Sequence, residues 1–171
     1  EKDIQDYGTG SIRYNTPGAT YSIKTLAKLM IQQSDNTAAY IIANHIVGTS
    51  DIQKLVDSWG LTQTDVANNK TSNLDVSILM KKLYKREIAG EAYTLEMLSF
   101  LKDTDFENRL PALLPDSATV YHKIGTEVGV LNDIGIVQDR SLVYYIVILT
   151  TDVDKEEETE LIAAQISKTV Y

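Results

Sequence analysis

The hydrophobic pattern of this 171-residue chain changes its period near residue 119. Before that point, apolar residues recur at the three- and four-residue spacing of amphipathic helices. After it, runs rich in β-branched residues predict strands over 119–124, 130–138 and 142–150, with a hairpin turn at Asp139-Arg140-Ser141. Residues 155–170 return to helical spacing, and we expect their apolar residues to face inward: Leu161, Ile162, Ile166 and Val170. This order predicts an α+β fold in which helices pack on an antiparallel sheet.

The first 118 residues are predicted to be mainly helical. Apolar spacing predicts helices over 22–33, 36–47, 50–60, 72–86 and 91–102, and a shorter one over 106–114. Ser22, Ser50 and Ser72 are the expected N-caps, and residues 61–71 are expected to form a loop. A chain of this length is one domain or most of one. We therefore expect a single partial domain, in which residues 119–171 form a three-strand meander and a C-terminal helix.

Composition argues against several classes of function. The net charge of −8 and the pI of about 4.7 argue against a nucleic-acid partner, which needs a basic surface. The absence of cysteine excludes disulfides, thiolate metal sites and a cysteine nucleophile. With only His45 and His122, a histidine-rich metal centre is not expected, and no metal or other cofactor is implied. No apolar run reaches the roughly 18 residues that a membrane-spanning helix needs.

Two short motifs stand out from this background. Ser34-Asp35-Asn36 lies between two expected helices, and Lys123-Ile124-Gly125-Thr126 lies at the end of an expected strand, about ninety residues later. Each has a simple interpretation: Ser34 or Asn36 could cap the second helix, and Lys123 could be a solvated strand residue. Their order and their placement together favour a catalytic interpretation.

With these motifs, the chain resembles the downstream portion of class A β-lactamases and penicillin-binding serine hydrolases. The resemblance implies a β-lactamase/transpeptidase-like fold and attack of a serine hydroxyl on an amide carbonyl, giving an acyl-enzyme. It implies that Ser34 and Lys123 are catalytic, with Ser34 in a proton relay to the leaving nitrogen and Lys123 as the charge beside it. It also implies three substrate-binding residues, which are Asn36 through its side chain, Gly125 through its small size, and Thr126 through its backbone N–H in the oxyanion hole.

Two departures from the family pattern affect substrate binding and turnover. Ile124 replaces the Thr or Ser whose hydroxyl bonds the substrate carboxylate, so carboxylate recognition would fall to Lys123 and Thr126. The loop at 61–71 is short and lacks the Glu that activates the deacylating water in class A enzymes. Its only carboxylate is Asp65, and a loop aspartate is more often a turn residue than a base.

The third departure is the absence of the nucleophile motif Ser-x-x-Lys upstream of Ser34. A match at Ser99-Phe100-Leu101-Lys102 lies downstream on an expected helix, and we reject it because one match is expected by chance. We expect an upstream segment of the same protein to supply the nucleophile helix and the first two strands of the family sheet. Without that segment, residues 142–149 would expose an apolar edge strand. Tyr7 could be an aromatic wall at the mouth of the site, although a plain loop tyrosine is the simpler interpretation.

Three functions remain open on this basis. The leading one is a β-lactamase-like serine hydrolase that opens the β-lactam ring through an acyl-enzyme. The second is a penicillin-binding protein or D-Ala-D-Ala peptidase, which Ile124 and the missing loop Glu favour. The third is a non-catalytic relative that binds peptidoglycan or a partner protein. The resemblance implies a β-lactam or peptidoglycan-peptide substrate and a location outside the cytoplasm, whether secreted, periplasmic or lipid-anchored.

Overall fold

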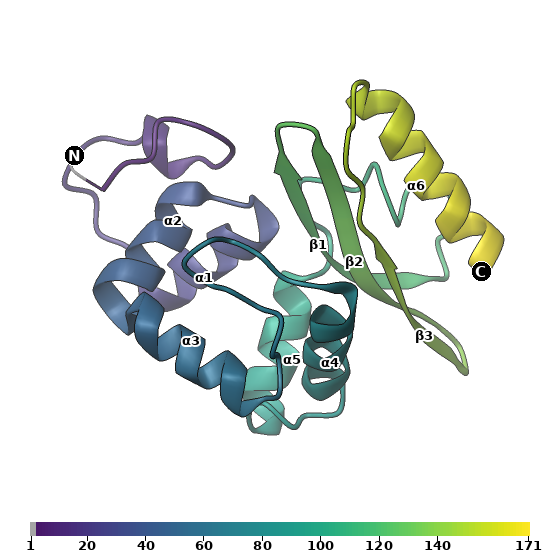
Figure 1. The fold of residues 1–171 in the computed structure, drawn as a ribbon, viewed down its shortest axis with the longest axis horizontal. Helices are drawn as coiled ribbons and strands as arrows, with labels where there is room; N and C mark the ends of the chain where they lie inside the picture. The colour runs from purple at the N-terminus through teal and green to yellow at the C-terminus, as the bar shows by residue number, and fades with distance from the viewer. Residues whose placement is uncertain (1–2) are drawn as a thin grey trace. The chain divides into compact units, whose positions relative to one another are not determined.

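The computed structural model describes residues 3–171, and its contacts divide the chain into two compact units. The first unit ends at Asp75, and the second is Val76–Tyr171. The elements along the chain are η1 (Ile12–Tyr14), α1 (Ile23–Gln32), α2 (Asn36–Ile41), η2 (Ile42–Val47), α3 (Thr49–Ser58), α4 (Asn73–Tyr84), α5 (Glu91–Phe100), β1 (Thr119–Glu127), β2 (Val130–Asp139), β3 (Leu142–Ile148) and α6 (Glu156–Val170) (Figure 1). The α+β prediction is confirmed.

Helices α1 to α3 form most of the first unit. The hydroxyl of Ser22 accepts a hydrogen bond from the backbone N–H of Thr25, which confirms this residue as the N-cap of α1. Helix α2 continues as the π-helical stretch η2 and ends at Gly48, whose φ of 94° favours glycine. The predicted cap at Ser50 is wrong, because α3 begins at Thr49 and its N-cap is Gly48, two residues earlier.

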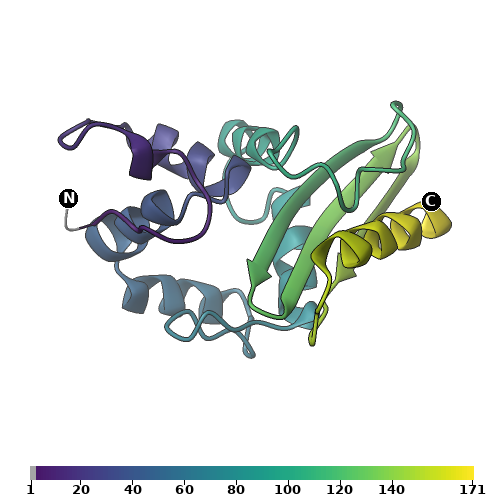
Figure 2. The same ribbon diagram turned by 90° about the horizontal axis from the view of Figure 1, so that it is seen from above.

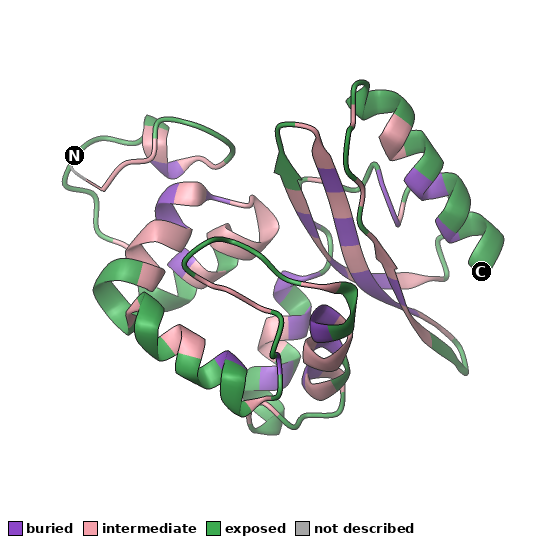
Figure 3. Ribbon diagram, viewed as in Figure 1, coloured by how far each residue is buried: buried purple, intermediate pink, exposed green. Residues whose placement is uncertain are grey.

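The second unit is built on an antiparallel sheet of order β1-β2-β3. All three predicted strands are confirmed, and a two-residue turn at Arg140 and Ser141 joins β2 to β3. Burial alternates along β1 and is greatest on the central strand β2, which Figure 3 shows as mostly buried and half-buried bands. The core on this sheet consists of Leu110, Val120, Val137 and Ile146.

Helix α6 runs along one face of the sheet (Figure 2) and packs against β2. The predicted inward face of this helix is wrong: its buried residues are the small ones, Ala163, Ala164 and Ser167, whereas Leu161, Ile162, Ile166 and Val170 are all exposed. Small side chains let the helix backbone approach the sheet, and the Ser167 hydroxyl donates to the Leu110 carbonyl at 2.8 Å. The larger apolar residues are therefore left as an uncovered stripe beside the sheet.

The helix predicted over 106–114 is also wrong, because these residues form turns. Pro111 has no N–H to donate, and the N–H of Leu110 donates instead to the Asp133 carboxylate on β2 at 3.1 Å. Just before this segment, the N–H of Thr104 donates to the Glu107 carboxylate at 2.6 Å. Side chains thus accept the backbone hydrogen bonds that a helix would have used.

Candidate active site

Asp35 is the residue that caps α2. Its carboxylate accepts from the N–H of Ala38 at 2.9 Å and, through its other oxygen, from the N–H of Ile12 at 2.9 Å. The residue is almost wholly buried. The interpretation of Ser34 or Asn36 as the cap is therefore wrong, and capping does not explain why these two residues flank Asp35.

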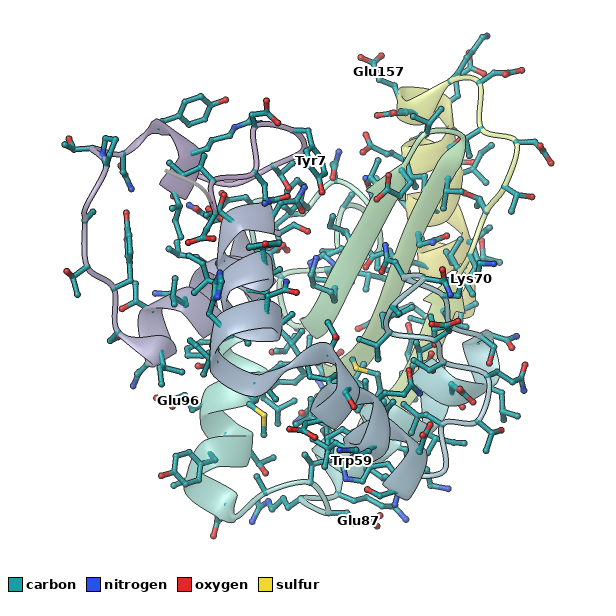
Figure 4. All side chains as sticks on the ribbon, turned by 60° about the vertical axis from the view of Figure 1, so that its left-hand side comes forward. Tyr7, Trp59, Lys70, Glu87, Glu96 and Glu157 are labelled. Carbon is teal, nitrogen blue, oxygen red and sulfur yellow. The ribbon has the colours of Figure 1, made fainter. Side chains whose placement is uncertain are left out.

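Ser34 forms a bend between α1 and α2. Its φ of 51° lies in the left-handed region, which is uncommon for a residue other than glycine and is often found at functional positions. The loop before α1 holds this bend, because the Thr9 hydroxyl donates to the Ser34 carbonyl at 2.8 Å. The Asn36 side-chain amide donates to the Tyr7 carbonyl at 3.2 Å, while Tyr7 as a whole is 63% exposed (Figure 4).

Two glycines allow this loop to approach so closely. A Cβ at Gly8 would lie 2.2 Å from the side chain of Asn36, and a Cβ at Gly10 would lie 2.3 Å from that of Asp35. Both glycines also have positive φ values. The sequence of the loop is therefore fitted to the Ser-Asp-Asn bend.

The second motif lies on β1, where successive side chains point to opposite faces of the sheet. Ile124 is buried in the core, whereas Lys123 lies on the other face and donates to the Ile124 carbonyl at 2.7 Å. Burial lowers the pKa of Lys123 to about 8; the Asp133 carboxylate opposes this lowering and the Arg109 guanidinium adds to it. The amine can therefore exchange a proton near neutral pH, as a relay requires.

Gly125 and Thr126 complete the motif toward the end of β1. A Cβ at Gly125 would meet only Asn132, at an ordinary contact distance of 3.8 Å, so packing within the protein does not require glycine there. Thr126 is exposed, and its hydroxyl accepts from the Arg109 guanidinium at 2.8 Å.

Arg109 is a functional candidate that the sequence did not reveal. It is buried, and its other donors reach the Asn132 carbonyl at 2.9 Å and the Glu160 carboxylate at 3.3 Å. Its partners come from β1, β2 and α6, so no local pattern could indicate them. In the helix predicted for this segment, an arginine would have been an ordinary surface residue.

The loop predicted at 61–71 is confirmed as irregular apart from one isolated bridge. Its only carboxylate, that of Asp65, is bonded within the loop. One oxygen of Asp65 accepts from the N–H of Asn68 at 3.0 Å, and the other accepts from the Asn68 side-chain amide at 2.7 Å. These bonds lower the pKa of the Asp65 carboxyl. The arrangement is that of a turn residue and not of a general base.

The same loop is fixed at two further points within the first unit. The buried carboxylate of Asp75 accepts from the Gln63 N–H at 2.7 Å and from the Thr64 hydroxyl at 2.8 Å. The Gln53 side chain accepts from the Val66 N–H at 2.9 Å and donates to the Thr64 carbonyl at 2.9 Å. The loop is therefore anchored by side chains of α3 and α4.

The Ser-x-x-Lys match on α5 is a surface feature. The Ser99 hydroxyl donates to the Glu96 carbonyl of its own helix at 2.7 Å, and the Lys102 amine lies 3.6 Å from the Asp103 carboxylate. Within residues 3–171, no group of three or more acidic, histidine or cysteine side chains is arranged to hold a metal ion. Over the same residues, the helices are too short or too polar to span a bilayer.

The predicted site residues thus fall into two groups. Ser34 and Asn36 lie together in the first unit, at a bend that Asp35 and the preceding loop hold in place. Lys123, Gly125 and Thr126 lie along one strand of the second unit, with Arg109 bonded to the last of them. Each group presents hydroxyl, amide or ammonium groups of the kind that acyl transfer uses.

Solved structures similar to this chain are β-lactamases and penicillin-binding proteins. One described as "Structure of PBP-A" is 28% identical, has a TM-score of 0.89, and is matched over 99% of this chain and 67% of its own. A variant of PBP-A, solved as an acyl-enzyme complex with penicillin G, is also 28% identical, with a TM-score of 0.88 and the same coverage. A serine-to-glycine variant of the TLA-1 extended-spectrum β-lactamase is 25% identical, with a TM-score of 0.87, over 99% of this chain and 71% of its own.

Comparison with curated proteins gave no match. The family model described as "Beta-lactamase enzyme family", however, matches residues 1–171. This match spans both motifs and agrees with the structural comparisons. The chain therefore belongs to the β-lactamase enzyme family.

Proposed function

We propose that this chain is the downstream part of a serine hydrolase that β-lactams acylate and that releases the acyl group slowly. The observation that carries the proposal is the arrangement of the loop at 61–71, whose only carboxylate is bonded to Asn68. The Ser-Asp-Asn bend and the Lys-Ile-Gly-Thr strand supply groups for acylation. The loop supplies no base for the water that would complete turnover.

In the proposed acylation step, a serine on the upstream segment attacks the β-lactam carbonyl. The Ser34 hydroxyl passes a proton to the leaving nitrogen, since a hydroxyl can accept and donate at once. Lys123, with a pKa near 8, supplies positive charge to the substrate. Asn36 holds the substrate amide, and the Thr126 N–H stabilises the oxyanion together with the nucleophile's own N–H.

Arg109 offers a physical replacement for the hydroxyl that is missing at Ile124. Its guanidinium donates to the Thr126 oxygen, which leaves the hydroxyl hydrogen of Thr126 able to donate to a carboxylate. Accepting a bond from a cation polarises the O–H and makes it a better donor. We therefore assign recognition of the substrate carboxylate to Thr126, backed by Arg109, and to Lys123.

We also propose that an upstream segment of the same protein pairs with β3 and covers part of α6. Strand β3 is an edge of the described sheet, with exposed apolar residues at Leu142 and Val143. The α6 stripe of Leu161, Ile162, Ile166 and Val170 is exposed as well. About a third of the PBP-A chain has no counterpart in this one, which is enough length for strands and a nucleophile helix.

A D-Ala-D-Ala peptidase is the second candidate function. Peptidase and β-lactam chemistry both begin by forming an acyl-enzyme. The Asp65 carboxylate is bonded to Asn68 of its own loop, which favours an enzyme that does not hydrolyse β-lactams rapidly. Since peptidoglycan peptides lie outside the cytoplasm, we propose an extracytoplasmic location for the protein.

The decisive experiment is an intact-mass time course of the full-length gene product with penicillin G. The expected result is a mass increase of one penicillin that persists for minutes or longer. An adduct that forms and clears within seconds would contradict slow deacylation, and no adduct would favour a non-catalytic binding relative. Ser99→Ala is the matched control and should acylate normally, because Ser99 lies on the surface and its hydroxyl donates to the Glu96 carbonyl of its own helix.

Release of D-Ala from a peptide ending in D-Ala-D-Ala tests the second candidate. Steady release, blocked by prior treatment with penicillin G, would support a peptidase. The absence of release with a stable penicillin adduct would leave the β-lactam-acylated hydrolase as the better description.

A further inference from the structure

His122 is a fully buried histidine that the acylation scheme above does not use. It lies on β1 next to Lys123, on the opposite, core-facing side of the strand. Its Nδ1 lies 2.9 and 3.0 Å from the two carboxylate oxygens of Asp133, which is also fully buried. Gly135 stands opposite His122 across the strand pair, where a Cβ would come within 3.0 Å of the His122 Cβ. The sheet is thus fitted around this side chain.

The second ring nitrogen also faces acceptors. The Nε2 of His122 lies 3.2 Å from a Glu107 carboxylate oxygen and 3.2 Å from the Thr104 hydroxyl oxygen. The Thr104 hydroxyl donates to that same Glu107 oxygen at 2.9 Å, so its own oxygen is left to accept from Nε2. Both ring nitrogens then carry hydrogen, which makes the ring an imidazolium.

The electrostatics agree with this geometry. Burial alone would lower the pKa of His122, but the hydrogen bond to Asp133, and then the one to Glu107, raise it to about 9. Burial by itself would raise the pKa of Glu107, whereas the bonds from His122 and Thr104 hold it below the usual value. We call His122, Asp133 and Glu107 the imidazolium clamp.

The clamp holds the chain on both sides of Arg109. Glu107 is bonded to His122, and the N–H of Leu110 donates to Asp133 at 3.1 Å. Arg109 therefore lies on a segment that is hydrogen-bonded to the sheet two residues before it and one residue after it. Its guanidinium then reaches the Thr126 hydroxyl at 2.8 Å.

We propose that His122 is a positioning residue for substrate binding: the imidazolium clamp fixes residues 104–110 on the sheet and so holds the Arg109 guanidinium against Thr126. The substrate-binding role of Thr126 rests on the proposed function, whereas the clamp itself does not. His122 acts through Arg109 and touches no substrate.

The clamp depends on the second proton of the ring. A neutral imidazole has one N–H, and if that hydrogen stays on Nδ1 toward Asp133, a lone pair on Nε2 faces the Glu107 carboxylate. The bond to Glu107 is then lost, and residues 104–110 are released at one end. The other charged groups around the ring and its partners are Lys123 on β1, Arg109 on the same segment as Glu107, and Glu160 on α6.

Histidine NMR on the full-length gene product tests the clamp directly. His122→Asn and His45→Gln assign the two ring signals of this chain, and the exposed His45 serves as the internal reference. The His122 ring is expected to titrate near pH 9, with the Arg109 Nε–H and the Thr126 amide shifting at the same midpoint. Repeating the titration in Lys123→Met removes the group on β1 that titrates closest to this range.

Glu107→Gln is the matched variant, because it keeps an acceptor but removes the charge on a half-exposed side chain. The midpoint of His122 is expected to fall by about 1 to 3 pH units. The proposal would be overturned if the His122 midpoint in the wild-type protein lay near pH 6.5. It would also be overturned if the Arg109 and Thr126 signals did not shift as His122 titrates.

A kinetic measurement separates positioning from a purely structural role. At pH 7.5, His122→Gln should weaken apparent penicillin G binding about 10-fold or more while changing the saturating acylation rate little. A variant that only unfolds would lower the fraction acylated and leave both constants unchanged, and that result would count against positioning. If penicillin G forms no adduct even with the wild-type protein, the proposed function fails, and the NMR titration still decides whether the clamp exists.

Discussion

The carboxylate of Asp35 accepts a hydrogen bond from the backbone N–H of Ile12, 23 residues earlier in the chain, at 2.9 Å. The same carboxylate caps α2 through Ala38. One buried side chain therefore fixes both the start of a helix and the loop that closes over the Ser-Asp-Asn bend. The middle residue of the motif therefore has a structural role, which is to hold the bend and the loop together.

Replacing Asp35 with Ala should destabilise the protein by about 2–4 kcal/mol, since it removes a helix cap and leaves the buried N–H of Ile12 without a partner. Urea unfolding followed by circular dichroism measures the change. Asp51→Asn is the control, because Asp51 is an exposed residue in the first turn of α3 and should cost under about 0.5 kcal/mol. Equal losses in both variants would contradict the anchoring role.

Ser34→Gly and Ser34→Ala should differ in stability but not in activity. Both lack the hydroxyl that we propose as the proton relay, and penicillin acylation should slow by about 10²–10⁴-fold. Glycine tolerates the φ of 51° at this position, so Ser34→Gly should be about 1 kcal/mol more stable than Ser34→Ala. Mass spectrometry of samples quenched at successive times gives the acylation rates, and thermal unfolding gives the stabilities. Normal acylation in either variant would remove Ser34 from the relay.

Arg109→Ala should weaken apparent binding of penicillin G by about 10–100-fold, because Thr126 loses the cation that polarises its hydroxyl. Thr126→Val removes the same hydroxyl and should have a similar effect. The double variant should add little to either single change, as coupled partners do. Acylation rate against penicillin concentration measures this, and Arg86→Asn, at an exposed arginine paired with Glu91, is the control. Additive losses would show that the two residues act separately.

The stability contributed by His122 should depend on pH in a defined direction. The folded-state pKa, about 9, lies above the unfolded value of about 6.5, so this contribution is complete below about pH 6.5 and is lost as pH rises through 9. The difference in unfolding free energy between wild type and His122→Gln should therefore shrink from pH 6 to pH 10. Urea titrations at these two pH values measure it, and a constant difference would mean that the ring is neutral in the folded protein.

The elements with clear apolar periods could be predicted from the sequence, because one buried face is enough to define a helix or strand. The stretch at 106–114 could not be, because its backbone partners come from elsewhere: Asp133, which bonds Leu110, is 23 residues away. The inward face of α6 was mistaken because large apolar residues were expected to be buried. The close approach to the sheet instead selects Ala163, Ala164 and Ser167.

The candidate site divides in the same way. Ser34, Asn36 and Lys123 were found from the motifs, yet the sequence did not show that the cap is Asp35 or that burial shifts the pKa of Lys123. Arg109 and the partners of His122 were invisible, since each is defined by contacts between separate elements. Chemistry carried by neighbouring residues can be seen in a sequence, whereas positioning by distant residues cannot.

The turn that Asp65 makes with Asn68 affects how much β-lactam a given amount of protein can remove. A hydrolase with a base in this loop would clear antibiotic for as long as it is present, so elapsed time would set the amount destroyed. A protein whose loop carboxylate is committed to its own turn would work as a titrant. Under the proposed function, each copy would bind one β-lactam molecule, and the number of copies would set how much β-lactam is taken up.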